Sequence, residues 1–162
     1  IHAQKTEAFA SFLGPLGVIL PGRIVMYRKP LIRQYIPIEA ITAQVEIIPA
    51  LEGGDGSLME FVSGKTDGIV LVGFPPGNVS PGMNTAITKT LKRNVPVVLV
   101  HRAIGGVLNE GYHSDGGPEA QLLGAGVLAG GSLTAAKARL KLMVALSHTR
   151  DQEQLRQLFQ NW

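Results

Sequence analysis

Two runs of apolar residues constrain the fold of this chain more than any other feature. The runs "DGIVLVG" (67–73) and "VPVVLVH" (95–101) are rich in β-branched residues and show no alternation of polar and apolar positions. Strands that are apolar throughout are typical of a parallel sheet covered on both faces. Between the runs, Ser80 followed by Pro81 predicts the start of a helix, which we expect to continue to about residue 93. The segment therefore predicts a β–α–β unit.

The same alternation of strand and helix patterns extends from residue 44 to the end of the sequence. The 162 residues, of which 45% are hydrophobic and 17% are charged, have the composition of a globular domain of ordinary size. We expect residues 44–162 to form an α/β domain. Its predicted architecture is a three-layer sandwich, in which helices flank a small, mainly parallel sheet.

Residues 1–43 have a different pattern. The β-branched runs "LGVIL" and "RIVMY" flank Pro21-Gly22, an arrangement that favours a β-hairpin. The following stretch "KPLIRQYIPIEAIT" contains two prolines and is more typical of a linker than of a helix or strand. The sequence therefore predicts an interdomain linker and β-hairpin segment at 1–43, ahead of the α/β domain.

Helical spacing also predicts which side chains are buried. In the short helix expected at 57–65, the buried side chains are predicted to be Leu58, Phe61 and Val62. Thr134 is a predicted N-cap, and Asp151 with Gln154 forms a predicted capping pair for the last helix. The apolar residues expected to share one face are Leu133, Ala136, Leu140, Met143 and Val144 in the first of these helices and Leu155, Leu158, Phe159 and Trp162 in the second.

Composition and motif spacing exclude several classes of function. The chain has no cysteine, which excludes thiol nucleophiles, disulfides and Cys-type zinc sites. Its four histidines lack metal-ligand spacing, "GAGVLA" (124–129) follows a helical pattern and not a strand, and there is no Walker loop, so no metal and no cofactor are expected. The net charge of +3 comes from scattered residues, which argues against nucleic acid as a partner. No apolar run approaches the length of a membrane span, and no membrane partner is expected.

Candidate binding residues lie in the loops that follow the predicted strands. Ligands of open parallel sheets bind beyond the carboxyl ends of the strands. Asn78 lies in such a loop, after the stiff pair Pro75-Pro76, and its amide could bind a ligand that carries both a carboxylate and an amine. Glu110 and Tyr112 occupy the later glycine-flanked loop and could bind a substrate ammonium group and donate a hydrogen bond. We found no nucleophile next to a base, so no catalytic residue is predicted.

Simpler roles are open for each of these side chains. Asn78 could close a turn by bonding its own backbone. Glu110 could be a solvated loop acid and Tyr112 a packing anchor. Arg102 could hold a ligand carboxylate, or it could form a structural ion pair with Asp115 or Glu119. Residue spacing alone does not decide between these interpretations.

Several longer stretches, in order along the chain, resemble one enzyme family. The stretches "GGDGSLMEFVSGKTDGIVLVGFPPGNVSPGM", "VPVVLVHRAIGGVL" and "GVLAGGSLTAAKARLKLMVALSHTRDQEQLRQLF" are similar to the C-terminal domain of bacterial L-asparaginases and glutaminase-asparaginases. The stretch "KTEAFASFLGPLGVILPGRIVMYRKP" is similar to the interdomain region of that family. The resemblance covers nearly the whole chain.

The resemblance implies a function that this chain performs only in part. Enzymes of the family hydrolyse a side-chain amide and release ammonia, with threonine nucleophiles from a larger N-terminal domain. The TGGT-like and HGTD-like motifs of that domain do not occur here. We therefore expect the catalytic domain to be absent from this chain and the isolated chain to be inactive. The resemblance also implies a homo-oligomer, in which this domain completes a neighbouring active site.

The resemblance also bears on the candidate residues. It implies that Asn78 holds substrate or the catalytic constellation, that Glu110 touches the substrate amine, and that Tyr112 helps to shape a site. Pro75 and Pro76 replace the flexible or polar residues of the family's loop, which leaves the preference between asparagine and glutamine open. The compartment, bacterial cytoplasm or periplasm, is also open. A non-catalytic module that binds a small amino acid or mediates assembly is the alternative function.

Overall fold

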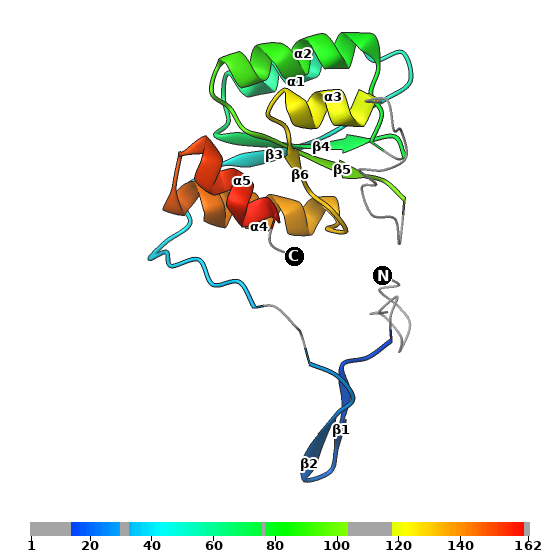
Figure 1. Ribbon diagram of the computed structural model, residues 1–162, viewed down its shortest axis with the longest axis vertical. Helices are drawn as coiled ribbons and strands as arrows, with labels where there is room; N and C mark the ends of the chain where they lie inside the picture. Colours follow the sequence, from blue (N-terminus) through cyan, green and yellow to red (C-terminus); the bar gives the residue numbers. More distant parts are fainter. Residues whose placement is uncertain (1–13, 30–32, 76, 104–117, 161–162) are drawn as a thin grey trace. The chain divides into compact units, whose positions relative to one another are not determined.

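The computed structural model describes residues 14–29, 33–75, 77–103 and 118–160 (Figure 1). The chain divides into two compact units, Ile1–Tyr35 and Ile36–Trp162.

The first unit contains the predicted β-hairpin. Strands β1 (Gly17–Leu20) and β2 (Arg23–Met26) pair antiparallel, and Gly22 adopts a φ of 78° in the turn between them. Only glycine adopts such a φ readily, which explains why the Pro-Gly dipeptide stands there. Ile19 and Ile24 lie opposite each other in the ladder, yet they are 83% and 67% exposed. The hairpin therefore presents apolar side chains that its own unit does not cover.

The second unit confirms the predicted α/β architecture. Strands β3 (Val45–Pro49), β4 (Gly68–Gly73), β5 (Val97–His101) and β6 (Leu128–Ala129) form one sheet in that order, and every pair is parallel. Helices α1 (Ser57–Ser63), α2 (Pro81–Lys92) and α3 (Pro118–Gly124) connect successive strands. Helices α4 (Ala135–His148) and α5 (Gln152–Gln160) follow the last strand.

The order of the strands explains the three layers. Right-handed crossovers between neighbouring strands in sequential order place every connecting helix on the same face of the sheet. Figure 1 shows α1, α2 and α3 on one face, so the opposite face is left for α4 and α5. Two apolar clusters fill the spaces between the layers, and alternate residues of β4 belong to different clusters: Leu71 packs toward α2, and Val70 packs toward α4.

The predicted helix starts are also confirmed. The Ser80 hydroxyl accepts a hydrogen bond from the Met83 amide at 3.2 Å, with Pro81 as the first helical residue. Thr134 accepts from the Lys137 amide, and the Asp151 carboxylate accepts from the Gln154 amide at 2.9 Å. Each side chain satisfies an amide that a helix leaves unpaired at its N-terminus. No helix among the described residues has the length and apolar character that crossing a membrane requires.

The prediction of the buried face of α1 is wrong for two of its three residues. Leu58 and Phe61 are 57% and 62% exposed, whereas Met59 is fully buried and Val62 is partly buried. The contact between Gly56 and α2 explains the rotation of the helix. A Cβ atom at Gly56 would lie 2.6 Å from the Ala86 Cβ atom, so the start of α1 is held close against α2 and turns Met59 into the core.

The prediction for α4 is wrong for Ala136 and Leu140, which are exposed, whereas Leu133 and Met143 are partly buried against the core as predicted. Its fully buried residues are Ala138, Leu142 and Ala145, while Leu140 is exposed. Small side chains at 138 and 145 let α4 approach the sheet closely, and Leu142 lies over Gly68, where a Cβ atom would be only 3.0 Å from its Cδ2. For α5, Leu155 and Phe159 are buried and Leu158 is partly buried, as predicted, and Trp162 lies outside the described residues.

Asp67 joins the start of the sheet to the C-terminal layer, and its loss is expected to weaken the fold slightly. Its Oδ2 accepts from the Gln44 amide at 2.8 Å and its Oδ1 accepts from Arg150 Nη2 at 2.9 Å. The Gln44 amide first, and then Arg150, hold the pKa of Asp67 below its ordinary value of 3.8. A lowered folded-state pKa stabilises the fold above the unfolded-state pKa, and that stability is lost as the pH falls through the folded-state value.

We therefore expect Asp67→Asn to lower the free energy of unfolding by about 1 kcal/mol at pH 7, a modest value because the group is partly solvated. The difference from the wild type should shrink as the pH is lowered below about 4. Urea unfolding of both proteins between pH 7 and pH 3 measures this. Glu46→Gln, at an exposed position on β3, is the control. A difference that is independent of pH would contradict the assignment.

Candidate functional site

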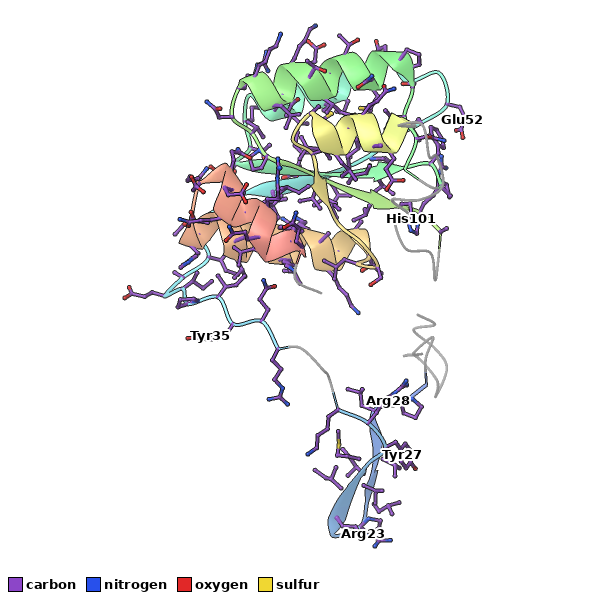
Figure 2. The ribbon with its side chains drawn as sticks, in the orientation of Figure 1. Arg23, Tyr27, Arg28, Tyr35, Glu52 and His101 are labelled. Carbon is purple, nitrogen blue, oxygen red and sulfur yellow. The ribbon has the colours of Figure 1, made fainter. Side chains whose placement is uncertain are left out.

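The candidate site lies at the edge of the sheet where the strands end. Because β3, β4 and β5 are parallel, the loops that follow them meet at this edge. The loops begin after Pro49, Gly73 and His101. Figure 2 shows Glu52 and His101 at this same end of the sheet.

The turn that carries Asn78 is closed by its backbone. The Phe74 amide donates to the Asn78 carbonyl at 2.8 Å, and the Asn78 amide donates to the Phe74 carbonyl at 2.9 Å. Gly77 has a φ of 141°, and the turn folds back onto Gly73, where a Cβ atom would lie 3.1 Å from the Asn78 carbonyl oxygen. Glycine is therefore needed at both positions.

The Asn78 side chain has a different environment from its backbone. Its Oδ1 atom is buried, and no group of the described residues donates a hydrogen bond to it. The simpler interpretation, that this side chain closes the turn, would require such a bond. A buried amide oxygen without a donor costs free energy, and in native proteins it calls for a partner.

The loop after β3 is fastened to the start of α2. The Ser80 hydroxyl donates to the Gly54 carbonyl at 2.6 Å, in addition to capping α2. Asp55 Oδ1 accepts from the Ser57 amide at 2.9 Å, and this bond lowers the pKa of Asp55. A Cβ atom at Gly82 would lie 2.7 Å from the Asp55 carbonyl oxygen. These contacts hold two of the three loops in fixed positions, and they leave Ser80 engaged as a cap and not available as a nucleophile.

Arg102 connects the loops of all three strands. Its guanidinium group lies 4.4 Å above the centre of the Phe74 ring, and Nη2 lies 3.3 Å from Glu52 Oε1. Of the two predicted ion-pair partners, Asp115 lies outside the described residues, and Glu119 is not the acid seen beside Arg102. Both Arg102 and Glu52 are exposed, so the pair adds little stability and the guanidinium group stays accessible to a ligand.

His101 is a polar residue at the end of an otherwise apolar strand. Both of its ring nitrogens are buried, and neither has a hydrogen-bond partner among the described residues. In the register of the sheet, His101 lies beside Gly73. The sequence signal for this residue was weak, because a histidine at a strand end is compatible with many roles.

The structure does not test the other predicted binding residues. Glu110 and Tyr112 lie in 104–117, outside the described residues, so their positions relative to Asn78 stay predictions. Across the described part of the chain, no group of three or more His, Asp or Glu side chains could hold a metal ion. The described edge thus offers hydrogen-bonding groups and an accessible guanidinium group. The Ser57 hydroxyl also hydrogen-bonds to the Asp55 carboxylate, and because the Ser57 amide and this hydroxyl lower the pKa of Asp55, that carboxylate is a weak base.

Comparison with known proteins gives the family of this chain. Residues 44–159 match the model of the glutaminase/asparaginase C-terminal domain. The chain is 30% identical to a probable L-asparaginase of Deinococcus radiodurans and 31% identical to an L-asparaginase of Bacillus licheniformis, over 98% and 91% of its length. It is also 30% identical, over 99% of its length, to an L-asparaginase of Thermococcus kodakarensis.

The matched regions show how much of each relative the chain spans, and which domain it contains. They make up 49%, 46% and 49% of these three proteins, so the chain spans about half the length of each. The family model describes the C-terminal domain, and it matches the parallel sheet together with the helices on both of its faces. The chain therefore belongs to the glutaminase/asparaginase family, and residues 44–159 are its C-terminal domain.

Proposed function

We propose that this chain is the substrate-orienting part of an amidohydrolase that converts L-asparagine and water to L-aspartate and ammonia. The nucleophile of the reaction would come from an N-terminal domain, as the family resemblance implies. The observation that carries the proposal is the Asn78 side chain, whose buried Oδ1 lacks a donor at the tip of a turn that the backbone already closes. An acceptor held in this way is suited to the ammonium group of a small amino acid.

The topology of the sheet supports a site that another domain completes. Binding crevices in open α/β sheets form where neighbouring connections leave toward opposite faces. Here the strands follow one another in sequence, and the helices between them share one face, so the described sheet has no such point. Loops at its carboxyl edge would therefore form one wall of a site and would need a second wall from elsewhere.

The β-hairpin supports the presence of an N-terminal partner domain. It precedes the matched C-terminal domain, but the similarity to the asparaginases extends over nearly the whole chain. A lone two-stranded hairpin is marginally stable in water, and Ile19, Ile24 and Tyr27 are each more than 60% exposed. We propose that residues 1–43 belong to the interdomain region and that the N-terminal domain covers these side chains.

Two further assignments belong to the proposal. Glu110 would bind the substrate amine and Tyr112 would line the site, as the resemblance implies. The complete enzyme would be a homo-oligomer, in which the loops at the carboxyl edge reach an active site of a neighbouring subunit. The substrate is then the small amino acid asparagine, and aspartate is the product.

Substitution of Asn78 tests the proposal. In the product of the full reading frame, Asn78→Ala is expected to lower kcat/KM for L-asparagine by about 100-fold, since the loss of one well-placed hydrogen-bonding group at a buried site commonly has an effect of this order. The melting temperature should change little, because the turn keeps both backbone bonds. Ammonia release under initial-rate conditions gives kcat and KM.

Asn84→Ala is the matched control, because Asn84 is exposed on α2 in the same β–α–β unit. It should leave both constants unchanged. If Asn78→Ala also leaves kcat and KM at their wild-type values, Asn78 has no part in binding or orientation.

A further inference from the structure

The backbone groups on the free edge of β3 are largely protected. The Ala50 amide donates to a carbonyl of β4, so Val45 and Pro49, whose positions alternate with that of Ala50, direct their backbone groups to the free edge. The Val45 carbonyl accepts a hydrogen bond from Arg139 Nε at 2.7 Å, and Pro49 has no N–H group. Few groups are therefore left at this edge for another extended segment to pair with.

The opposite edge of the sheet, at β6, is open. The Gly130 amide donates to the Leu99 carbonyl of β5 at 2.7 Å, so Ala129, one residue earlier, directs its N–H and C=O groups to the free side of β6. Among the described residues, these two groups have no hydrogen-bond partner. An edge residue of this kind can exchange hydrogen bonds with another extended molecule.

A groove of about 350 Å³ lies beside the open edge. Ala129 lines it together with the apolar side chains Leu123, Val127 and Phe159 and the polar residues Arg156 and Gln160. In Figure 1, α3 and α5 lie on either side of β6, so these two helices form the walls of the groove. Its volume is at the lower end of the range for sites that bind small molecules.

Arg156 gives this groove a positive charge. The residue is exposed, and in the described part of the chain its guanidinium group has no ion-pair or hydrogen-bond partner. None of the residues that line the groove is acidic. A guanidinium group beside an apolar wall suits a ligand in which a carboxylate is attached to an apolar chain.

We propose that the groove binds a free apolar α-amino acid, for which leucine is the representative. The amino acid exchanges two hydrogen bonds with Ala129, as one residue does with its partner in the hydrogen-bonded pair of an antiparallel ladder. Its ammonium group donates to the Ala129 carbonyl, and its carboxylate accepts from the Ala129 amide. Arg156 binds the same carboxylate, and the apolar side chain lies between Leu123, Val127 and Phe159. This site goes beyond the proposed function, because it uses neither the carboxyl edge of the sheet nor a nucleophile.

Calorimetric titration of the product of the full reading frame with L-leucine tests the site. Arg156→Gln is expected to raise the Kd of leucine about tenfold, because it removes the charge that binds the carboxylate. L-Leucinamide, which lacks the carboxylate, and 4-methylpentanoate, which lacks the ammonium group, should each bind about tenfold more weakly than leucine. In Arg156→Gln, the difference between leucine and leucinamide should shrink, since the substitution and the amide remove the same contact.

Two variants serve as controls. Lys137→Gln removes one positive charge from an exposed position on α4 that does not line the groove, and it should leave the Kd of leucine unchanged. Asn78→Ala alters the proposed substrate site at the carboxyl edge and should also leave this Kd unchanged. Leucine binding and the hydrolysis of asparagine are therefore tested independently of each other.

Four results would overturn the assignment. The first is the absence of leucine binding at millimolar concentration, and the second is an unchanged Kd in Arg156→Gln. The third is binding to the 162-residue chain but not to the complete enzyme, which would show that another domain or subunit covers the groove. The fourth is tighter binding of N-acetyl-L-leucine than of leucine, which would assign the groove to the C-terminal residue of a peptide.

Discussion

Purified alone, the 162-residue chain is expected to release no ammonia from L-asparagine or L-glutamine above the buffer blank, whereas the product of the full reading frame releases it readily. At the described carboxyl edge, the Ser57 hydroxyl hydrogen-bonds to Asp55, a weak base because its pKa is lowered, and Ser80 is occupied by the Gly54 carbonyl and the Met83 amide. Hydrogen-bonding groups without a nucleophile can orient a substrate, but they cannot form a covalent intermediate. We therefore expect ammonia release from the product of the full reading frame and none from the isolated chain.

A coupled assay for ammonia, run at several protein concentrations, measures both proteins. If the rate of ammonia release rises in proportion to the concentration of the isolated chain, the proposal that the nucleophile lies in a separate N-terminal domain is wrong. Activity in neither protein, together with a reading frame that encodes no second domain, would favour the non-catalytic module that binds a small amino acid. A shift in melting temperature on addition of L-asparagine would then measure the binding itself.

The sequence predicted the elements because their signals are local. The apolar runs of β4 and β5, the Ser80-Pro81 start of α2 and the Pro-Gly turn of the hairpin each depend on a few neighbouring residues. Family resemblance and the strand patterns agreed on the α/β fold, and the structure and the comparisons confirm both.

The buried faces of α1 and α4 could not be predicted in the same way. A seven-residue helix with apolar residues at 58, 59, 61 and 62 has two possible inward faces, and helical spacing does not choose between them. Contacts at glycine decide the orientation of each helix: Gly56 against α2 for α1, and Gly68 under Leu142 for α4. Such contacts join residues far apart in the sequence.

The candidate site was predictable in position but not in detail. The rule for strand ends selected the Asn78 loop, and the sequence could not show that the backbone closes this turn and leaves Oδ1 unused. Likewise, the acid seen beside Arg102 is Glu52, from a loop 50 residues away in the chain. The fold brings Arg102 and Glu52 together, and no local sequence pattern predicts this contact.

The close contact between Gly82 and Asp55 leads to a second large expected effect. Gly82 lies in the first turn of α2, where alanine would ordinarily be favoured over glycine by up to about 1 kcal/mol. At this position we expect the opposite preference, with glycine more stabilising than alanine. The new Cβ atom would lie 2.7 to 2.9 Å from three backbone atoms of Asp55, and backbone cannot move aside as a flexible side chain can.

We expect Gly82→Ala to lower the free energy of unfolding of this chain by about 2 to 3 kcal/mol, the cost of forcing a methyl group into a tightly packed contact. Because the displaced residues are those that Ser80 fastens to α2, the substitution should also weaken the proposed site in the complete enzyme. Urea denaturation followed by circular dichroism gives the free energy. Gly124→Ala is the matched control. Gly124 is the last residue of α3, and a Cβ atom there meets no described atom within 4 Å, so we expect no loss of stability.

Both substitutions add a methyl group to a helical glycine, and only the one at Gly82 meets backbone atoms, so their comparison tests the contact between the loop and the helix. Gly124→Ala should be neutral or should stabilise the chain by up to about 1 kcal/mol, through the reduced freedom of the unfolded state. If Gly82→Ala behaves in the same way, residues 52–56 do not press against α2. The rigid support inferred for this side of the site would then be wrong, and the positions of Asn78 and Arg102 would have to depend on the N-terminal domain.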